Sequence, residues 1–354
     1  MPHPSPRPRE LGFSMPGEWA PHRACWLAWP WDGSLWLDAL DPVQAAWVEL
    51  CAGIADVDAP AATRRPELLE VVVPSEAARV DCAAALARRG VNARFHVIPF
   101  GDIWMRDIAP LFLTNGNGGL LAASFEFNGW GGKFDLPGDA ELSMRVAERS
   151  GHAAWRADWV LEGGSVECDG EGTCLTTRQC LLNPNRNPAL DERVITDRLR
   201  SDLGVEHVVW LGDGLLNDHT DGHIDTIARY VAPGVVLTME ATTASDPNRD
   251  ALRALVGDLR EARDARGRRL EVVTVRTPGA VLDPDGEIMA ASYVNFYLAN
   301  GAVVVPVYGV EQDDEACRVI GTLFPDRRVV PVSAREVLEG GGAFHCITQQ
   351  EPLP

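Results

Sequence analysis

The sequence has no long apolar run and little positive charge. No stretch of about 18 uncharged apolar residues occurs in the chain, so we expect no membrane-spanning helix. Acidic residues outnumber Lys and Arg by 51 to 32, the formal net charge is −19, and Lys133 is the only lysine. Nucleic-acid binding requires a clustered positive surface, so this balance argues against a nucleic-acid partner. A negative field favours a cationic ligand, although such a charge also simply maintains solubility.

Paired cysteines and a secretory signal are also missing. None of the eight cysteines forms a Cys-x-x-Cys pair, and residues 1–9 lack the apolar core of a signal peptide. We therefore expect reduced thiols and a cytoplasmic location. The proline-rich residues 1–14 are expected to form a disordered tail, and Met15 is an alternative translation start. No linker or composition shift divides residues 15–354, which are expected to form one catalytic domain.

What the sequence does contain is a repeated unit, in which an amphipathic helix is followed by a short turn and an apolar strand. Five such units recur at roughly 50 to 65 residues. The helices are expected near 77–89, 139–150, 188–203, 248–265 and 313–324, and the strands near 91–98, 154–161, 206–211, 270–275 and 328–332. This alternation predicts an α/β fold built from similar units, although helix and strand also alternate in other long α/β chains.

Dense polar motifs follow four of these strands. They are Trp104-Met105-Arg106-Asp107, Glu162-Gly163-Gly164, a cluster around His223, and the segment from Gly340 to Cys346. The successive separations of Asp107, Glu162, His223 and Cys346 are 55, 61 and 123 residues, and the last is about two repeats. Equivalent loops of a ring of units would meet in one pocket, which is the form expected of an active site.

The residue types in these motifs favour chemistry at a guanidinium group. Carboxylates around Cys346 raise the pKa of its thiol, which does not suit a neutral substrate. A guanidinium reverses this effect, because two carboxylates can hold it bidentately while its charge favours the thiolate. Asp107 and Asp225 are the candidate clamp. Glu162 is expected to hold either the imidazole of His223 or a guanidinium nitrogen.

The expected reaction uses Cys346 as nucleophile and His223 as acid and base. The thiolate would attack the guanidinium carbon, and His223 would protonate the leaving nitrogen. His223 would then deprotonate a water that hydrolyses the S-alkylthiouronium intermediate to a urea. His345 adjoins Cys346, but neighbouring side chains on a helix or strand diverge, so His223 is the better base. The segment 129–133 lacks the phosphate-loop pattern and does not predict nucleotide binding.

Seven motifs, in order along nearly the whole chain, together resemble one family. They are Met15–Trp19, Trp26–Pro30, Trp104–Asp107, Phe127–Lys133, Glu162–Gly164, Asp221–Asp225 and Gly340–Gln350. The chain resembles the agmatine deiminases, whose family also includes bacterial peptidylarginine deiminase. The resemblance implies a five-bladed, pseudo-symmetric α/β propeller, the pentein fold, and hydrolysis of agmatine to N-carbamoylputrescine and ammonia without metal or organic cofactor.

The resemblance also implies roles for individual residues. Cys346 would be the nucleophile and His223 the acid and base. Asp107 and Asp225 would contact the guanidinium, and Glu162 would be a supporting carboxylate. Trp104 would line the substrate channel, and Asn295 would lie near the site. A homodimer or larger assembly is implied as well. Two departures stand out. His219 occupies a position where we expect a carboxylate for the substrate's far amine, and Ala343-Phe344 replaces the usual Asn-Ile.

Three alternatives stay open at this stage. Another guanidine, either free arginine or peptidyl arginine, is the nearest alternative substrate. A metal-dependent hydrolase would use His219 and His223, four residues apart, with Asp218, Asp221 and Asp225. Against this alternative, the surrounding residues favour a turn entering a strand, where that spacing loses its meaning. A noncatalytic binding protein would have little reason to carry a thiol, an imidazole and three carboxylates in successive units.

Overall fold

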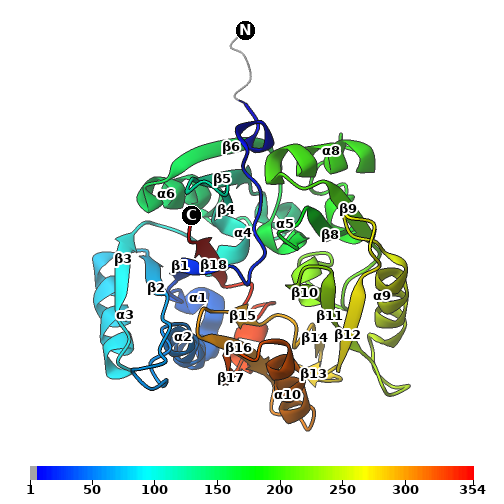
Figure 1. Ribbon diagram of the computed structural model, residues 1–354. Helices are drawn as coiled ribbons and strands as arrows, with labels where there is room; N and C mark the ends of the chain where they lie inside the picture. The colour runs from blue at the N-terminus through cyan, green and yellow to red at the C-terminus, as the bar shows by residue number, and fades with distance from the viewer. Residues whose placement is uncertain (1–5) are drawn as a thin grey trace.

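The computed structural model of the protein describes residues 6–354, so residues 1–5 of the tail predicted at 1–14 lie outside this range. The described residues contain five sheets of three or four strands, which follow one another around a common centre (Figure 1). Their strands are β18 (Thr348–Pro352), β1 (His22–Ala28), β2 (Leu68–Val73) and β3 (Ala93–Val97); β4 (Leu111–Thr114), β5 (Leu120–Glu126) and β6 (Ala153–Val160); β7 (Glu167–Cys168), β8 (Thr173–Thr177) and β9 (His207–Leu211); β10 (Ala228–Ala232), β11 (Val235–Glu240) and β12 (Glu271–Arg276); and β15 (Tyr297–Leu298), β16 (Ala302–Val307) and β17 (Arg328–Ser333). The expected five-unit α/β arrangement therefore agrees with the sheet topology.

Each sheet begins with an antiparallel pair and continues with a parallel one. A parallel neighbour requires a crossover, which a helix supplies. The crossover helices are α2 (Leu40–Ile54), α3 (Glu76–Arg88), α6 (Asp139–Ser150), α8 (Glu192–Leu203), α9 (Arg249–Glu261) and α10 (Asp313–Leu323). The last five, with the strands that follow them, are the five helix-strand units predicted from sequence, so that prediction is confirmed.

Helix α9 shows why the amphipathic pattern identifies these crossovers. Its buried residues are Leu252, Leu255, Val256 and Leu259, at spacings of three and four that form one face. That face packs against β11 and β12, while charged residues occupy the rest of the helix surface. No helix within residues 6–354 has the length and apolar character needed to cross a bilayer.

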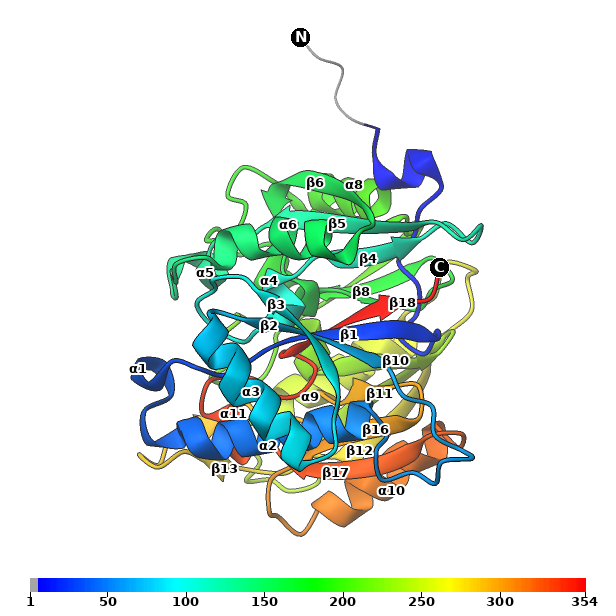
Figure 2. The ribbon, with the colours of Figure 1, turned by 90° about the vertical axis from the view of Figure 1, so that its left-hand side faces the viewer.

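The two ends of the chain share the first sheet. Strand β18 pairs antiparallel with β1, with Thr348 opposite Leu27 and Pro352 opposite His22. Figure 2 shows red β18 lying alongside blue β1, behind α3. The pairing ties the segment that carries Cys346 to the start of the fold.

The segment before β1 is ordered where the structure describes it. Pro8–Leu11 forms a short 3-10 helix, η1, which packs against α8. Arg7 donates to Asp202 at 3.2 Å, and Met15 N donates to Leu203 O at 2.9 Å. The disordered tail over residues 1–14 stays a prediction, and the described part of this segment has both a charged partner and backbone partners in α8.

Four short connecting elements bring the polar motifs to the centre of the ring. They are α4 (Met105–Ile108) between β3 and β4, η3 (Gly163–Ser165) between β6 and β7, η4 (Ile224–Thr226) between β9 and β10, and α11 (Arg335–Leu338) before the segment that leads to β18. Each of these elements therefore lies in the connection between the last strand of one sheet and the first strand of the next sheet. Element η3 contacts both α4 and η4, which brings residues far apart in the sequence close together.

Candidate active site

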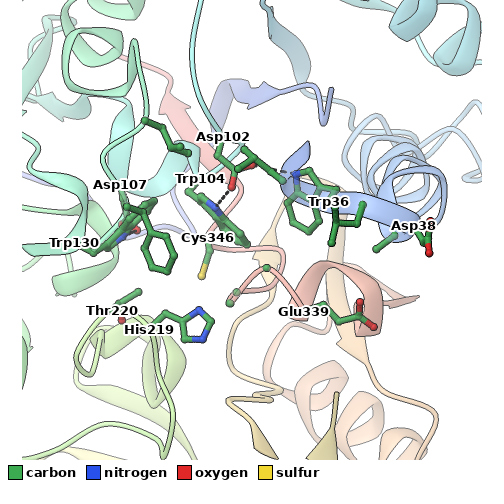
Figure 3. A pocket seen from close by; sticks show the side chains of 18 residues that line it. Trp36, Asp38, Asp102, Trp104, Asp107, Trp130, His219, Thr220, Glu339 and Cys346 are labelled. Atoms are coloured by element: carbon green, nitrogen blue, oxygen red, sulfur yellow. Dashed lines mark hydrogen bonds between the residues drawn. The ribbon is translucent and has the colours of Figure 1, made fainter. Parts of the chain in front are cut away.

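A pocket of about 510 Å³ opens at this centre. Cys346 and Asp107 lie in its lining with the indole rings of Trp36, Trp104 and Trp130. Figure 3 shows the sulfur of Cys346 pointing into the pocket, between Trp104 on one side and His219 on the other. The Cys346 residue is only 5% exposed, so the pocket gives its thiol a narrow approach.

Three consecutive glycines allow the backbone of the loop before Cys346 to pack closely against the rings of Trp36 and Trp104. Gly341 has a φ of +109°, which residues with a side chain rarely adopt. A Cβ on Gly342 would lie 2.7 Å from the Trp104 ring and 3.0 Å from the sulfur. A Cβ on Gly340 would lie 2.4 Å from Trp36. The glycine run thus lets the thiol and the two tryptophans share one wall.

Gly164 marks the point where the predicted polar residues converge. A Cβ there would lie 2.5 Å from His223 Nδ1, 3.0 Å from Asp107 Oδ1 and 3.2 Å from Asp225 Oδ2. The backbone at Gly164 can approach these side chains only because it carries none of its own. Three residues from three different connections therefore surround one glycine, as the repeat spacing predicts.

Hydrogen bonds fix the orientation of Asp107. Its Oδ1 accepts from Gly164 N at 2.9 Å, and its Oδ2 accepts from Trp130 Nε1 at 2.9 Å. The second oxygen also lies 3.8 Å from His223 Nδ1. Trp130 was not predicted as a site residue, although it belongs to the glycine-rich segment that the sequence analysis excluded as a phosphate loop.

Asn295 and Asp225 flank the sulfur of Cys346. Asn295 Nδ2 donates to Sγ at 3.2 Å, and its Oδ1 accepts from the backbone N of His345 at 3.1 Å. Asp225 Oδ2 lies 3.6 Å from Sγ. The structure therefore places both predicted residues against the predicted nucleophile.

Burial and like charges oppose ionisation of the acids on the pocket side. Burial first, and then the charges of Asp225 and Glu162, raise the pKa of Asp107 to about 6. Burial and the carboxylates of Asp225 and Asp107 raise the pKa of the Cys346 thiol well above its ordinary value. Burial and these two carboxylates therefore favour the protonated thiol over the thiolate.

The pKa values of His223 and Asp225 are shifted in the directions that favour the charged forms of both side chains. Burial favours the neutral ring of His223, but the nearby carboxylates outweigh it and hold its pKa well above 6.5. Burial also opposes ionisation of Asp225, yet the hydrogen bond and charge of His345 lower the pKa of this carboxyl. The site thus presents a charged imidazole and a charged carboxylate beside a neutral thiol.

Several buried polar atoms at this place lack a hydrogen-bond partner among the described residues. They are Oδ1 of Asp225, Oε2 of Glu162 and both ring nitrogens of His223. Glu162 is fixed through its other oxygen, which accepts from Arg186 Nε at 2.7 Å. Each such atom costs about 1–3 kcal/mol when left unpaired. Their concentration around the ring of His223 indicates a ligand that brings several donors at once.

A second buried network lies behind the sulfur. His345 Nδ1 is 2.7 Å from Asp225 Oδ2, and His345 Nε2 is 2.8 Å from Glu18 Oε1. Burial and the charges of Arg106 and Arg229 lower the pKa of His345, and the pKa values of the Glu18 and Asp225 carboxyl groups are lowered as well. The guanidinium of Arg229 binds both Glu18 and Glu167. This network reduces the negative charge that Asp225 sets against Cys346.

The sequence analysis missed the role of Glu18 and the position of His345. Met15–Trp19 was recognised only as a family motif, and nothing in its spacing predicts that Glu18 reaches the centre of the ring. His345 was considered only as an unlikely base, and its contacts with Glu18 and Asp225 agree that it points away from the pocket.

Two groups of metal-ligating side chains with ligand atoms within 4.8 Å occur among residues 6–354. One contains Glu162, Cys180 and His223, and the other contains Glu18, Glu167 and His345. Neither includes His219, Asp218 or Asp221. The set considered in the metal-hydrolase alternative is therefore not brought together.

Comparison with known proteins identifies the family of this chain. The Porphyromonas-type peptidyl-arginine deiminase family matches residues 14–352. The chain belongs to that family. It is 39% identical to the agmatine deiminase of Stutzerimonas stutzeri, with 98% of this chain and 97% of the relative covered. The family membership inferred from the motifs is thus confirmed.

Solved structures show the same relationship. The agmatine deiminase of Enterococcus faecalis, described as catalysing its reaction, has a TM-score of 0.91 and 34% identity, with 99% of each chain covered. A cysteine-to-serine variant of the C. jejuni agmatine deiminase, solved with substrate bound, has a TM-score of 0.85 and 25% identity, with 96% of each chain covered. The fold class predicted from the sequence is confirmed by these likenesses.

Proposed function

We propose that this protein hydrolyses agmatine to N-carbamoylputrescine and ammonia through a covalent bond to Cys346. The observation that carries the proposal is the set of unpaired buried atoms of Asp225, Glu162 and His223, which lie together beside Asp107 and include a neighbour of the Cys346 sulfur. A guanidinium is a planar cation with five N–H donors, and it satisfies the two carboxylates together. Full-length relatives named agmatine deiminase support the same substrate.

Binding of the cation activates the nucleophile. The guanidinium donates to Asp107, Asp225 and Glu162, which neutralises the charges that keep the thiol protonated. The pKa of Cys346 falls, and its proton leaves to solvent because His223 is already charged. Asn295 Nδ2, 3.2 Å from the sulfur, then stabilises the thiolate.

The first half of the reaction forms the S–C bond. The thiolate attacks the guanidinium carbon, the C–N bond to the leaving nitrogen breaks, and His223 transfers its proton to that nitrogen, which departs as ammonia. The product on the enzyme is an S-alkylthiouronium ester. His223 is now neutral and ready to act as a base.

Water completes the second half. His223 removes a proton from a water molecule, whose oxygen attacks the same carbon. The C–S bond breaks as the thiolate leaves, and the remaining O–H proton of this water goes to solvent, so that its oxygen becomes the urea oxygen of N-carbamoylputrescine. The thiolate and the charged imidazole are thereby restored. One histidine thus serves as acid and then as base without a metal ion.

The outer pocket favours an amine over a carboxylate at the far end of the substrate. Asp38, Asp102 and Glu339 line it, and among its described lining residues there is no lysine or arginine. Arg106, considered as a partner for the carboxylate of free arginine, instead donates to Glu18 at 3.2 Å and to the His345 carbonyl at 3.3 Å. Agmatine is therefore preferred to free arginine.

A direct test measures ammonia release from agmatine by the wild type and by Cys346→Ala. The variant is expected to lose at least about a thousandfold in kcat, as removal of a covalent nucleophile generally does. Normal turnover by a folded Cys346→Ala protein would refute the covalent route. Free arginine and a blocked arginine peptide serve as rival substrates, and faster turnover of either would overturn the assignment of agmatine. Retention of activity in a chelator, with loss on thiol alkylation, is expected.

We also propose a cytoplasmic location and a homodimer. All eight cysteines lie within the described residues and are free thiols, which favours a reducing compartment. The dimer rests on the family resemblance alone, and light scattering on the purified 38.4 kDa chain would test it.

A further inference from the structure

Cys180 is a buried thiol for which the proposed reaction has no use. It lies on α7 (Arg178–Leu181), a single turn whose N-terminus is capped by the side chain of Thr177. Its side chain has no exposed surface, and burial raises the pKa of the thiol. A buried cysteine is ordinarily inert packing, so only its neighbours can give this one a role.

Those neighbours are two residues of the active site. Ligand atoms of Cys180, Glu162 and His223 all lie within 4.8 Å of one another. Glu162 Oε2 and both His223 nitrogens are buried and unpaired in the described structure. Arg186 holds the other oxygen of Glu162 at 2.7 Å, which fixes the direction of the free one.

We propose that Cys180, His223 and Glu162 form a binding site for a thiophilic divalent cation, Zn²⁺ above all, which inhibits the enzyme by occupying its acid/base. A thiolate, an imidazole and a carboxylate are the ligand types that Zn²⁺ prefers, and three protein ligands leave a fourth position for water. On binding, the Cys180 S–H bond and one ring N–H bond of the charged His223 break, both protons go to solvent, and Zn–S and Zn–N bonds form. The thiolate and the carboxylate together balance the charge of the ion.

The other candidate group in the described structure lacks these properties. Glu18, Glu167 and His345 also lie within 4.8 Å of one another. Arg229 binds both of these carboxylates, and Arg106 donates to Glu18 at 3.2 Å. Two guanidinium groups already neutralise this group and would repel an added cation. Of these two groups of described residues, the one that contains Cys180 is therefore the better site for a metal ion.

Cobalt absorption tests the binding directly. Co²⁺ is added to metal-free protein in a Cys346→Ala background, which removes the other thiol of the site. We expect a thiolate-to-cobalt charge-transfer band that persists in Cys174→Ser, a matched change at a buried cysteine of β8, and disappears in Cys180→Ser. Zn²⁺ is expected to bleach the band. Because metal displaces the thiol proton, the affinity is expected to rise with pH.

Inhibition gives the second measurement, and this part rests on the proposed function. Zn²⁺ is expected to inhibit agmatine hydrolysis by the wild type, and Cys180→Ser is expected to need at least about tenfold more Zn²⁺ for half-inhibition. If the wild type does not hydrolyse agmatine, the proposed function fails while the cobalt band still tests the site.

Three results would overturn the site. They are absence of the band from the Cys346→Ala protein, its persistence in Cys180→Ser and Cys180→Ala, and equal Zn²⁺ sensitivity of wild type and Cys180→Ser. Circular dichroism establishes that each variant is folded, and Cys180→Ala replaces Cys180→Ser if the serine is not tolerated.

Discussion

Two groups of buried acids lie on opposite sides of the contact between His345 and Asp225, and they are neutralised in different ways. Behind the contact, Glu18 and Glu167 bind the guanidinium of Arg229. On the pocket side, Asp107 has only His223 as a charged partner, at 3.8 Å, and Glu162 keeps one oxygen, Oε2, without a hydrogen-bond partner among the described residues. In the first group the guanidinium of Arg229 pairs both acids, whereas in the second Arg186 pairs only one oxygen of Glu162, so this group can still accept donors from a bound cation.

This difference explains why one fold can bury so many carboxylates near a thiol. A paired buried charge is costly to break, so the rear group contributes to folding and to the position of His345. An incompletely paired group raises the energy of the empty site, and a bound guanidinium recovers that energy. Changes behind His345 should therefore act mainly on stability, and changes on the pocket side mainly on turnover.

The largest expected effect is that of Asp225→Asn. The amide keeps the size of the side chain but removes the charge beside the sulfur and one guanidinium acceptor. We expect kcat/KM for agmatine to fall about a thousandfold, measured by ammonia release, because a preorganised charge at the reacting centre is lost. The control is Asp202→Asn, a buried aspartate that binds Arg7 and Trp159 away from the pocket, which should retain activity. An Asp225→Asn enzyme with more than about a tenth of normal kcat/KM would contradict the proposed clamp.

Arg229→Gln should show the reverse pattern. The guanidinium is fully buried, donates to Glu167 at 2.9 Å and also binds Glu18, so its loss leaves two buried carboxylates without their cation. The free energy of unfolding should fall by about 3–5 kcal/mol, measured by urea denaturation. Arg269→Gln is the matched control, because its guanidinium is 57% exposed and its pairing with Glu261 is worth about 0.5 kcal/mol or less. Equal loss in both variants would remove the distinction between the groups.

The pKa of Asp107 gives a smaller effect that depends on pH. Its value of about 6 in the folded protein lies above the ordinary 3.8, so the folded state binds this proton more tightly than the unfolded state. The stability contribution is therefore complete below about pH 4 and is lost between about pH 4 and 6, by about 3 kcal/mol in total. Asp107→Asn removes this loss. The free energy of unfolding, measured at several pH values, should rise for the variant relative to the wild type between about pH 4 and 6. A difference between the two proteins that does not change with pH would contradict the raised pKa of Asp107.

The sequence predicts those parts of the molecule that follow a local period. The crossover helices show a buried face at spacings of three and four, as α9 does, and all five predicted helix-strand units are present. The same period predicts that Asp107, Glu162, His223 and Cys346 lie in equivalent connections. That one inference was enough to bring most of the candidate site together.

Contacts without a local period were not predictable in this way. Glu18 approaches His345 from 327 positions away, and the two ends of the chain pair through β1 and β18 with no periodic signal. Strand β7 has two residues, too few to show alternation. Trp130 reaches Asp107 from a turn with a φ of +52°, a backbone state that no hydrophobic pattern reports. The single-domain organisation of residues 15–354 stays a prediction.

The smallest effect concerns His219, where the family resemblance leads us to expect a carboxylate. Its ring lies at the pocket, exposed, 6.0 Å from the ring of Phe134, and close enough to Gly341 that a Cβ there would approach Nδ1 to 2.5 Å. His219→Glu adds one acid to the pocket side at the end that would hold the substrate's ammonium. An exposed pair of this kind is worth about 0.5–1 kcal/mol, so KM for agmatine should fall about two- to fivefold with kcat unchanged. His219→Gln, of similar size and no charge, should leave KM at the wild-type value, and equal KM values for the Glu and Gln variants would place the ammonium elsewhere, beside Asp38, Asp102 or Glu339.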